Sequence, residues 1–233
     1  MEHHSFTWFD LIPGWSSLHI PWWITMTVFV CMILIFLSVC ASTAARFTEV
    51  KLLPDKGVSF RNFVEILVSS LLSFVESILG HQARKYLSLV GGLFLFIFVS
   101  NLLGLIPGFL PPTSHLTVNF GCALVVFFYY NYCGFKENGM GYLKHFMGPV
   151  IWLAPLMIVV EVIGHAVRPA SLSLRLFGNI NGDHMLVSTI SQLVPIGASI
   201  PFLFLGLFVS FLQAFIFTLL SMVYISMSTA HDH

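Results

Sequence analysis

Long apolar runs separated by short polar connections dominate this sequence. Residues 21–45, 86–106 and 117–135 contain no Asp, Glu, Lys or Arg, and each is close to the roughly 20 residues that an α-helix needs to cross the hydrocarbon core of a membrane. Pro21 opens the first run at a position that suits a helix start, and Trp22 and Trp23 follow it, as is common at the membrane interface. These runs predict three membrane-spanning helices.

The connections between the runs have patterns of their own. Within the polar connection at 46–85, residues 62–80 have apolar positions on one side of a helix and polar positions on the other, the polar ones being Glu65, Ser69, Ser73 and Glu76. We expect a helix that lies at the membrane surface or faces a partner. A turn rich in Pro and Gly at 107–112 joins the second run to the third, so residues 86–135 are predicted to form a helical hairpin.

Residues 149–228 are almost continuously apolar and are interrupted mainly by prolines, among them Pro169. Two interpretations fit this pattern. Either Pro169 separates two ordinary spans, or residues 149–194 form one kinked helix. A helix of that length would measure near 70 Å at about 1.5 Å per residue and would have to lie strongly tilted. Hydropathy alone leaves both interpretations open.

Composition narrows the class of protein. The 233 residues are 57% hydrophobic and 9% charged, and the mean hydropathy is +0.91, whereas a soluble domain is about 25% charged. Ten basic and ten acidic residues cancel, which leaves no net charge to attract nucleic acid. We therefore expect an all-α, polytopic membrane protein that forms a single membrane domain over residues 1–233, with the lipid bilayer as its solvent.

The placement of the basic residues predicts an orientation. Lys and Arg gather in the connections at 46–85 and 136–144, whereas the N-terminal residues 1–20 and the turn at 107–116 contain none. Because basic connections remain on the cytoplasmic side, the N-terminus is predicted to lie outside. If residues 149–194 form one helix, the C-terminus returns to the cytoplasm.

Ionisable residues continue into the apolar C-terminal region. Each costs roughly 2.5–3.5 kcal/mol to insert in a membrane, so a functional role is the default interpretation. At about 100° per residue, six polar side chains lie within about 80° of one another and form one stripe about 33 Å long. The members of this polar stripe are Glu161, His165, Arg168, Arg175, Asn179 and Asp183.

Simpler interpretations exist for part of the polar stripe. Arg168 and His165 could be interfacial residues whose polar ends reach for water, with Glu161 as the ion-pair partner of Arg168. Arg175 differs because its neighbours are apolar and no acidic residue lies four positions away on either side. Its counter-charge then has to come from elsewhere, such as another subunit.

The last apolar run also has a polar side. Five residues lie within about 80° of one another on a helix that is otherwise made of Leu, Phe and Ile: Ser210, Gln213, Ser221, Tyr224 and Ser228. Facing the polar stripe, they would suit an aqueous or hydrogen-bonded path between two helices. The alternative is that these groups only join helices to one another, as Ser and Gln often do in membranes.

Two segments resemble signature sequences of a known family. Residues 171–179, S-L-S-L-R-L-F-G-N, and residues 212–217, L-Q-A-F-I-F, are similar to segments of subunit a of F-type ATP synthases. The likeness extends to 100–107, S-N-L-L-G-L-I-P, and to 112–119, P-T-S-H-L-T-V-N, so it covers most of the chain. The resemblance implies about five membrane helices plus the interfacial helix. It also implies a hairpin of two long, strongly tilted helices at 149–228, which favours the single long helix.

The resemblance also implies roles for individual residues. Arg175 corresponds to the essential stator arginine, with Asn179 and Gln213 beside it. Glu161 and Ser171 match polar positions of the family's proton path.

Some positions depart from the family pattern. His184, preceded by Asp183, stands where the pattern L-R-L-F-G-N-x-x-x-x-E ends in an acid, and His115 replaces the acid of P-T-x-D-L-N. Gly206, seven positions before the glutamine, is a histidine in some relatives. Imidazole suits a proton relay because its unperturbed pKa is about 6.5. We therefore expect His115, Asp183 and His184 to share the role of the missing carboxylates.

The function implied by the resemblance is proton translocation by the stator subunit of the F0 sector of ATP synthase, in a bacterial plasma (inner) membrane. Two half-channels would serve a ring of c subunits. The outer path would use His184, Asp183, His115, Asn179 and Gln213, and the cytoplasmic path Glu161. The implied partners are the c-subunit ring, the b-subunit peripheral stalk and the other subunits of the complex.

Other function classes leave weaker signals. The sequence has no G-x-x-x-x-G-K-[ST] loop for a nucleotide and no H-E-x-x-H metal pair, so we expect no cofactor, no metal and no catalysis by this chain itself. A secondary transporter or a free-standing channel would also carry intramembrane charges, but such proteins more often show repeated halves or a self-contained pore.

Overall fold

All regular structure in the described part of the chain is helical. A computed structural model describes residues 21–46, 60–106, 109–139, 154–193 and 199–229. Its elements are α1 (Trp22–Arg46), α2 (Phe60–Leu79), the short 3-10 helix η3 (Gly80–Gln82), α3 (Ala83–Leu103), a second 3-10 helix η4 (Pro112–Ser114), α4 (Leu116–Asn138), α6 (Ala154–Leu193) and α7 (Ser199–Thr229).

The predicted spans are confirmed as helices. The runs at 21–45, 86–106 and 117–135 correspond to α1, α3 and α4. Among the described residues, six helices are long and apolar enough to cross a membrane, and α2 is one of them. The location of α2 at the membrane surface, like the orientation of the termini and the single-domain organisation, stays a prediction.

Helix α6 resolves the two interpretations of the C-terminal region, because it runs unbroken for 40 residues with Pro169 inside it. Proline removes one helical hydrogen bond, the one to the carbonyl four residues earlier, which here belongs to His165. At about 1.5 Å per residue, α6 is about 60 Å long, twice the hydrocarbon thickness of about 30 Å. If α6 remains within the hydrocarbon, it must therefore lie about 60° from the membrane normal.

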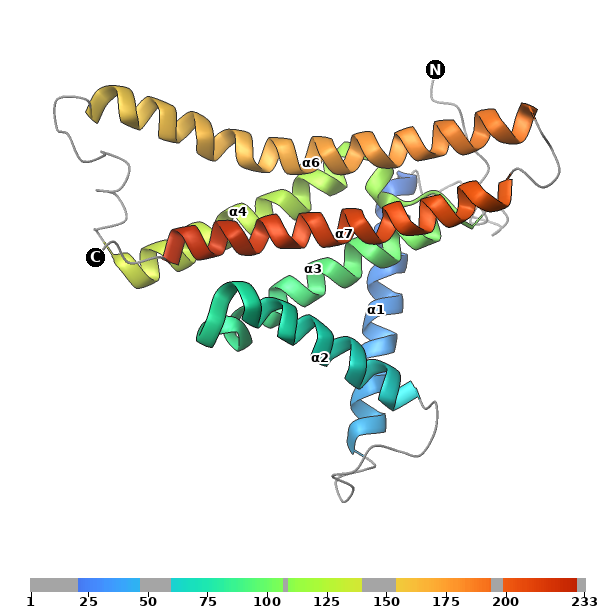
Figure 1. Cartoon of the computed structure of the whole chain (residues 1–233), viewed down its shortest axis with the longest axis horizontal. Coiled ribbons are helices and arrows are strands. Elements are labelled where there is room, and N and C mark those ends of the chain that lie inside the picture. The colour runs from blue at the N-terminus through green and yellow to red at the C-terminus, as the bar shows by residue number, and fades with distance from the viewer. Residues whose placement is uncertain (1–20, 47–59, 107–108, 140–153, 194–198, 230–233) are drawn as a thin grey trace.

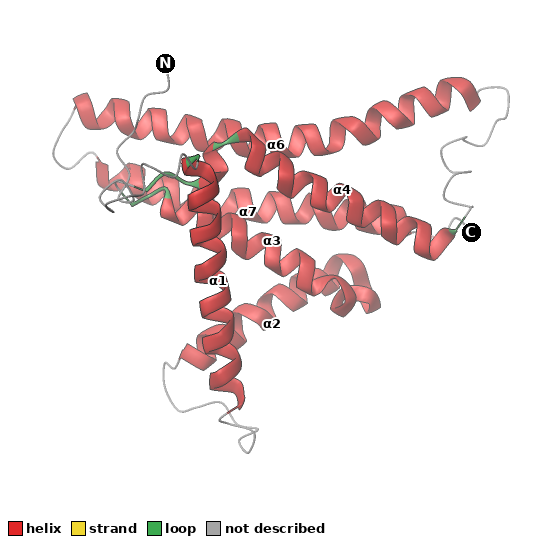
Figure 2. Cartoon of the chain, turned by 180° about the vertical axis from the view of Figure 1, so that it is seen from behind, coloured by secondary structure: helices red, strands yellow, loops and turns green. Residues whose placement is uncertain are grey.

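The arrangement of the helices agrees with such a tilt. In Figure 1, α6 and α7 run side by side and cross the direction of α1 at a steep angle, while α3 and α4 run obliquely to both. Figure 2 shows the same relation from behind, with α1 in front of the other helices. If α1 crosses the membrane directly, the pair of α6 and α7 lies strongly inclined, as the predicted hairpin requires.

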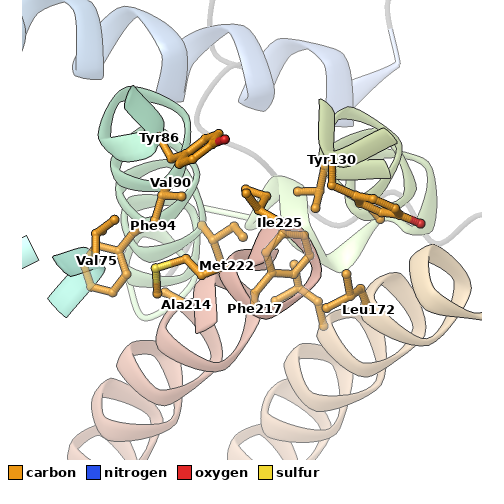
Figure 3. Close-up of a cluster of buried hydrophobic side chains, with 14 of the residues drawn as sticks. Val75, Tyr86, Val90, Phe94, Tyr130, Leu172, Ala214, Phe217, Met222 and Ile225 are labelled. Carbon is orange, nitrogen blue, oxygen red and sulfur yellow. The ribbon is translucent and has the colours of Figure 1, made fainter. Parts of the chain in front are cut away.

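A modest core joins the helices, and it is drawn in Figure 3. Val90 and Phe94 of α3, Tyr130 of α4, Leu172 of α6 and Phe217 of α7 belong to one buried cluster. Many other large apolar side chains remain exposed on the outside of the helices. An apolar exterior around a small core suits a chain that is surrounded by lipid or by other membrane subunits.

Helices α3 and α4 are linked near their ends, but each packs along α7 rather than along the other, so their predicted pairing as a hairpin stays a prediction. At one end, Lys85 Nζ lies 2.5 Å from Glu137 Oε1, and the Tyr86 hydroxyl donates to the same oxygen at 3.1 Å. At the other end, Gly104 packs so closely on Pro111 that an added Cβ would lie 2.8 Å from Cγ of the proline ring. A glycine is therefore required where the chain leaves α3 and turns toward η4.

Candidate functional site

The continuity of α6 places the polar stripe on one helix. Because α6 is unbroken from Ala154 to Leu193, the predicted angular spacing of the stripe holds across Pro169. Within the described structure, α6 packs against α4, η4 and α7. These three neighbours supply the partners of the stripe.

Arg175 lies near the middle of the stripe with its side chain exposed. One turn further, Nδ2 of Asn179 donates to Oε1 of Gln213 on α7 at 2.7 Å. Gln213 is only 3% exposed, so this bond fixes Asn179 against α7. The structure thus brings together Asn179 and Gln213 as predicted, with Arg175 beside them and presented outward from the α6–α7 pair.

Toward the start of α6, three members of the stripe form a cluster. Oε1 of Glu161 lies 3.3 Å from Nδ1 of His165 and 3.8 Å from Nη2 of Arg168. The Arg168 guanidinium also lies 5.3 Å from the centre of the Tyr224 ring on α7. Arg168 is therefore held by a carboxylate and an aromatic ring. The ion pair with Glu161 is the one that the simpler interpretation expected, and the location of Arg168 at the membrane interface stays a prediction.

Ser171 connects this cluster to the middle of the helix. Its hydroxyl lies 3.4 Å from the backbone oxygen of Arg168 and is oriented to donate to it. Its side chain is half-buried. Ser171 thus lies between Arg168 and Arg175 along the stripe, but its hydroxyl is engaged with its own helix.

The titratable residues predicted for the outer path lie in two separate places in the fold. Asp183 is half-buried near the end of α6, and the side chain of His184 lies outside the described residues. His115 lies at the start of α4, where its ring stacks on Trp23 with centroids 5.0 Å apart and meets the edge of Trp22 at 6.0 Å. Within the described part of the chain, Nδ1 of His115 is buried with no hydrogen-bond partner.

A network of amides holds η4 between the helices. Thr113 Oγ1 donates to Oδ1 of Asn101 on α3 at 2.8 Å, and Nδ2 of Asn119 donates to the Thr113 backbone oxygen at 2.7 Å. From α6, Nδ2 of Asn181 lies 3.2 Å from the backbone oxygen of Ser114. His115 and Asp183 are thereby carried on elements that are tied together, although neither touches Arg175.

The polar side of α7 faces inward. Gln213 meets Asn179 and Tyr224 meets Arg168, but the hydroxyls of Ser221 and Ser228 donate to carbonyls of their own helix. These serines are buried in the bundle, which agrees with close helix packing. Among the described side chains, the part of this side that includes Gln213 and Tyr224 is joined to the polar stripe.

Comparison with known proteins identifies the family. The model of the ATP synthase A chain family matches residues 24–226. The chain belongs to this family.

Several curated relatives carry the name ATP synthase subunit a. The one from Bdellovibrio bacteriovorus is 42% identical over 230 residues, covering 98% of this chain and 100% of the relative. That of Geobacter sulfurreducens is 42% identical over 209 residues, covering 90% and 87%. That of Trichlorobacter lovleyi is 44% identical over 204 residues, covering 88% and 85%. This member of the ATP synthase A chain family is thus a bacterial membrane protein from a family distinct from the catalytic subunits.

Sequence reasoning missed several residues of this A-chain member. Nothing in the sequence pairs Asn101 with Thr113 or Asn181 with the turn, because these partners are far apart along the chain. Tyr130, whose ring centroid lies 5.9 Å from that of His165, was expected only as part of an apolar run. The motifs at 100–107 and 112–119 were the available sequence signal for the hydrogen-bond network around η4, because they contain Asn101, Thr113 and Asn119.

Proposed function

We propose that this chain is the proton-translocating stator subunit of the F0 sector, working against a ring of c subunits. The observation that carries the proposal is an exposed arginine, Arg175, among apolar residues in the middle of a membrane helix of an ATP synthase subunit. Its neighbour Leu174 is 57% exposed, so the arginine projects from a largely apolar surface. An arginine at such a place needs a counter-charge, and a carboxylate on a neighbouring rotating ring supplies one.

In this proposal Arg175 acts as an electrostatic gate. The guanidinium favours the ionised form of a ring carboxylate that passes it, and it stays charged because arginine does not lose its proton in proteins. A ring carboxylate must therefore release its proton before it passes. Protons cannot cross directly from one half-channel to the other.

The two half-channels are assigned to opposite ends of the stripe. The outer path comprises His184, Asp183, His115, Asn179 and Gln213, and the Asn179–Gln213 hydrogen bond supports a polar boundary on that side of Arg175. The cytoplasmic path begins at Glu161, with Ser171 between it and Arg175. Each proton that crosses 100 mV contributes about 2.3 kcal/mol, which the ring converts into rotation for a catalytic head that other subunits form.

The remaining assignments concern surroundings and partners. The chain lies in the bacterial inner membrane with its N-terminus outside and its C-terminus in the cytoplasm. The b-subunit peripheral stalk holds it stationary against the ring. Exposed apolar side chains on α6 and α7, such as Leu174 and Phe208, suit close approach to the helices of the c ring.

Replacement of Arg175 tests the gate. Arg175→Ala should leave the complex assembled, because a small uncharged side chain inserts more easily into lipid than arginine. ATP synthesis should vanish, since nothing then forces a ring carboxylate to release its proton. Arg175→Lys should fail as well, because an ammonium loses its proton on desolvation and lacks the planar fork of guanidinium.

The measurements are ATP synthesis in membrane vesicles, passive proton flux with and without the catalytic head, and a blot for assembly. Ile35→Ala on α1 is the control, since it shortens an exposed apolar side chain on a helix outside the α6–α7 pair without removing charge, and it should support synthesis. Normal coupled synthesis by an assembled Arg175→Ala complex would refute the gate.

A further inference from the structure

His165 is a titratable residue on α6 that the half-channels described above do not use. Nδ1 of His165 lies 3.3 Å from Oε1 of Glu161 and 3.1 Å from the backbone oxygen of Glu161. Its side chain is 11% exposed, whereas that of Glu161 is 32% exposed. The imidazole therefore lies deeper than the carboxylate, in contact with it, within a helix that is long and apolar enough to cross the membrane.

The two oxygens near Nδ1 determine which ring nitrogen exchanges protons. A backbone oxygen can only accept a hydrogen bond, so the hydrogen in this contact belongs to Nδ1. A hydrogen bond that fixes one ring nitrogen leaves proton binding and release to the other. Nε2 is therefore the exchanging atom, and the nearby carboxylate stabilises the imidazolium that forms.

The charged and titratable groups around this pair come from three helices. On α6, Arg168 lies 3.8 Å from the Glu161 carboxylate. On α4, the ring of Tyr130 lies 5.9 Å from that of His165, and on α7 the ring of Tyr224 lies 6.0 Å from that of Tyr130. The Arg168 guanidinium lies 5.3 Å from the centre of the Tyr224 ring, which holds it in place.

Two different cations thus share one carboxylate. Arg168 stays charged at any physiological pH, so Glu161 retains a partner when the imidazole is neutral. When His165 gains a proton, the carboxylate has a second cationic partner. The cluster is neutral while the imidazole is neutral and carries one net positive charge once His165 is protonated, with both cations close to the same carboxylate.

We infer that His165 is a proton-exchanging residue of the cytoplasmic half-channel, with Glu161 as its carboxylate partner and Arg168 as the positioning residue of that carboxylate. The inference rests on the proposed function. A proton released by a ring carboxylate binds Nε2 and forms the imidazolium. Its departure from Nε2 toward the cytoplasm restores the neutral ring, so only an N–H bond forms and breaks.

Passive proton flux tests this role. The sample is inverted vesicles that carry the whole F0 sector without the catalytic head, so that the bath contacts the cytoplasmic face. His165→Gln keeps an N–H donor but exchanges no proton near neutral pH. We expect the flux to fall at least about tenfold and to lose the dependence on bath pH that a titrating imidazole confers. In His165→Ala, imidazole added to the bath should restore part of the flux, which a purely structural role would not allow.

Ser173→Ala is the matched control on the same helix. Ser173 is buried, and its hydroxyl donates to the Ala170 oxygen at 3.0 Å, so its removal should leave the flux unchanged. Parental flux and pH dependence in His165→Gln would overturn the inference. So would failed recovery of His165→Ala with imidazole, or loss of assembly in both His165 variants, since each would make the residue structural.

Arg175→Ala in the same vesicles separates this inference from the proposed function. If Arg175→Ala abolishes synthesis while His165→Gln conducts normally, the gate holds and only the His165 role fails. If Arg175→Ala synthesises ATP normally, the proposed function fails whatever His165 does.

Discussion

Thr113 provides a quantitative test of how the outer turn is held. The residue is fully buried, and its hydroxyl donates to Oδ1 of Asn101 at 2.8 Å. Thr113→Val keeps the shape of the side chain but leaves Oδ1 of Asn101 without its donor. Asn101 is only 5% exposed. An unsatisfied buried acceptor costs about 1–3 kcal/mol. A loss near 2 kcal/mol would lower the ratio of folded to unfolded chain roughly 30-fold.

Two further variants calibrate the measurement. Thr113→Ser retains the hydroxyl and removes a methyl group, so it should cost only about 0.8 kcal/mol. Thr189→Val removes a hydroxyl that is exposed and bonded to the Met185 oxygen of its own helix, and it should be nearly neutral. The assay is the fraction of the purified complex that keeps this chain folded and bound after heating in detergent.

The outcome also bears on the outer path. Because η4 precedes His115 and accepts a bond from Asn181, a loosened turn should lower passive proton flux as well as stability. Equal stability of Thr113→Val and Thr113→Ser would refute the reasoning, since it would mean that the hydroxyl of Thr113 does not sustain the network.

Two other predictions concern the segment that contains α3 and α4. Gly104→Ala should destabilise the chain by about 1–3 kcal/mol through overpacking against Pro111. Gly92→Ala, within the preceding helix α3 and with nothing within 4 Å, should be neutral or stabilising in the same heating assay. A cysteine at exposed Lys136 should react with an impermeant thiol reagent only from the cytoplasmic side, and one at exposed Ile106 only from outside. Labelling of Ile106→Cys from the cytoplasm would invert the proposed topology.

The sequence predicts where the helices lie along the chain better than it predicts how they continue and pack against one another. Runs without charge located α1, α3 and α4 to within a few residues, because a membrane helix must be both apolar and long. The same rule could not decide between one helix and two at Pro169, since a buried proline can either kink or end a helix. That outcome depends on packing against α4 and α7, which hydropathy does not encode.

In the candidate site, too, the sequence predicts which residues lie together on one helix but not which residues of other helices they contact. Helical spacing was enough to place Glu161, His165 and Arg168 together. It also placed Asn179 on the same stripe, and the family motif added Gln213 beside it. Partners from other helices could not be foreseen in the same way: Tyr224 lies 56 positions beyond Arg168 in the numbering of the chain, and only tertiary structure brings the two together. From the sequence alone, a serine of α7 whose buried hydroxyl donates to a carbonyl of its own helix cannot be distinguished from a serine that lines a proton path.

The inclination of α6 has a geometric consequence for the polar stripe. From Glu161 to Asp183 the helix advances about 33 Å along its axis. At an inclination of about 60°, only about 16 Å of this distance is depth, while about 29 Å is displacement within the plane of the membrane. The two ends of the stripe are therefore separated mostly sideways, and under the proposed function they open at places well apart along the circumference of the c ring. In that proposal a proton bound at one end reaches the other only by being carried laterally, and this lateral transport is rotation of the ring.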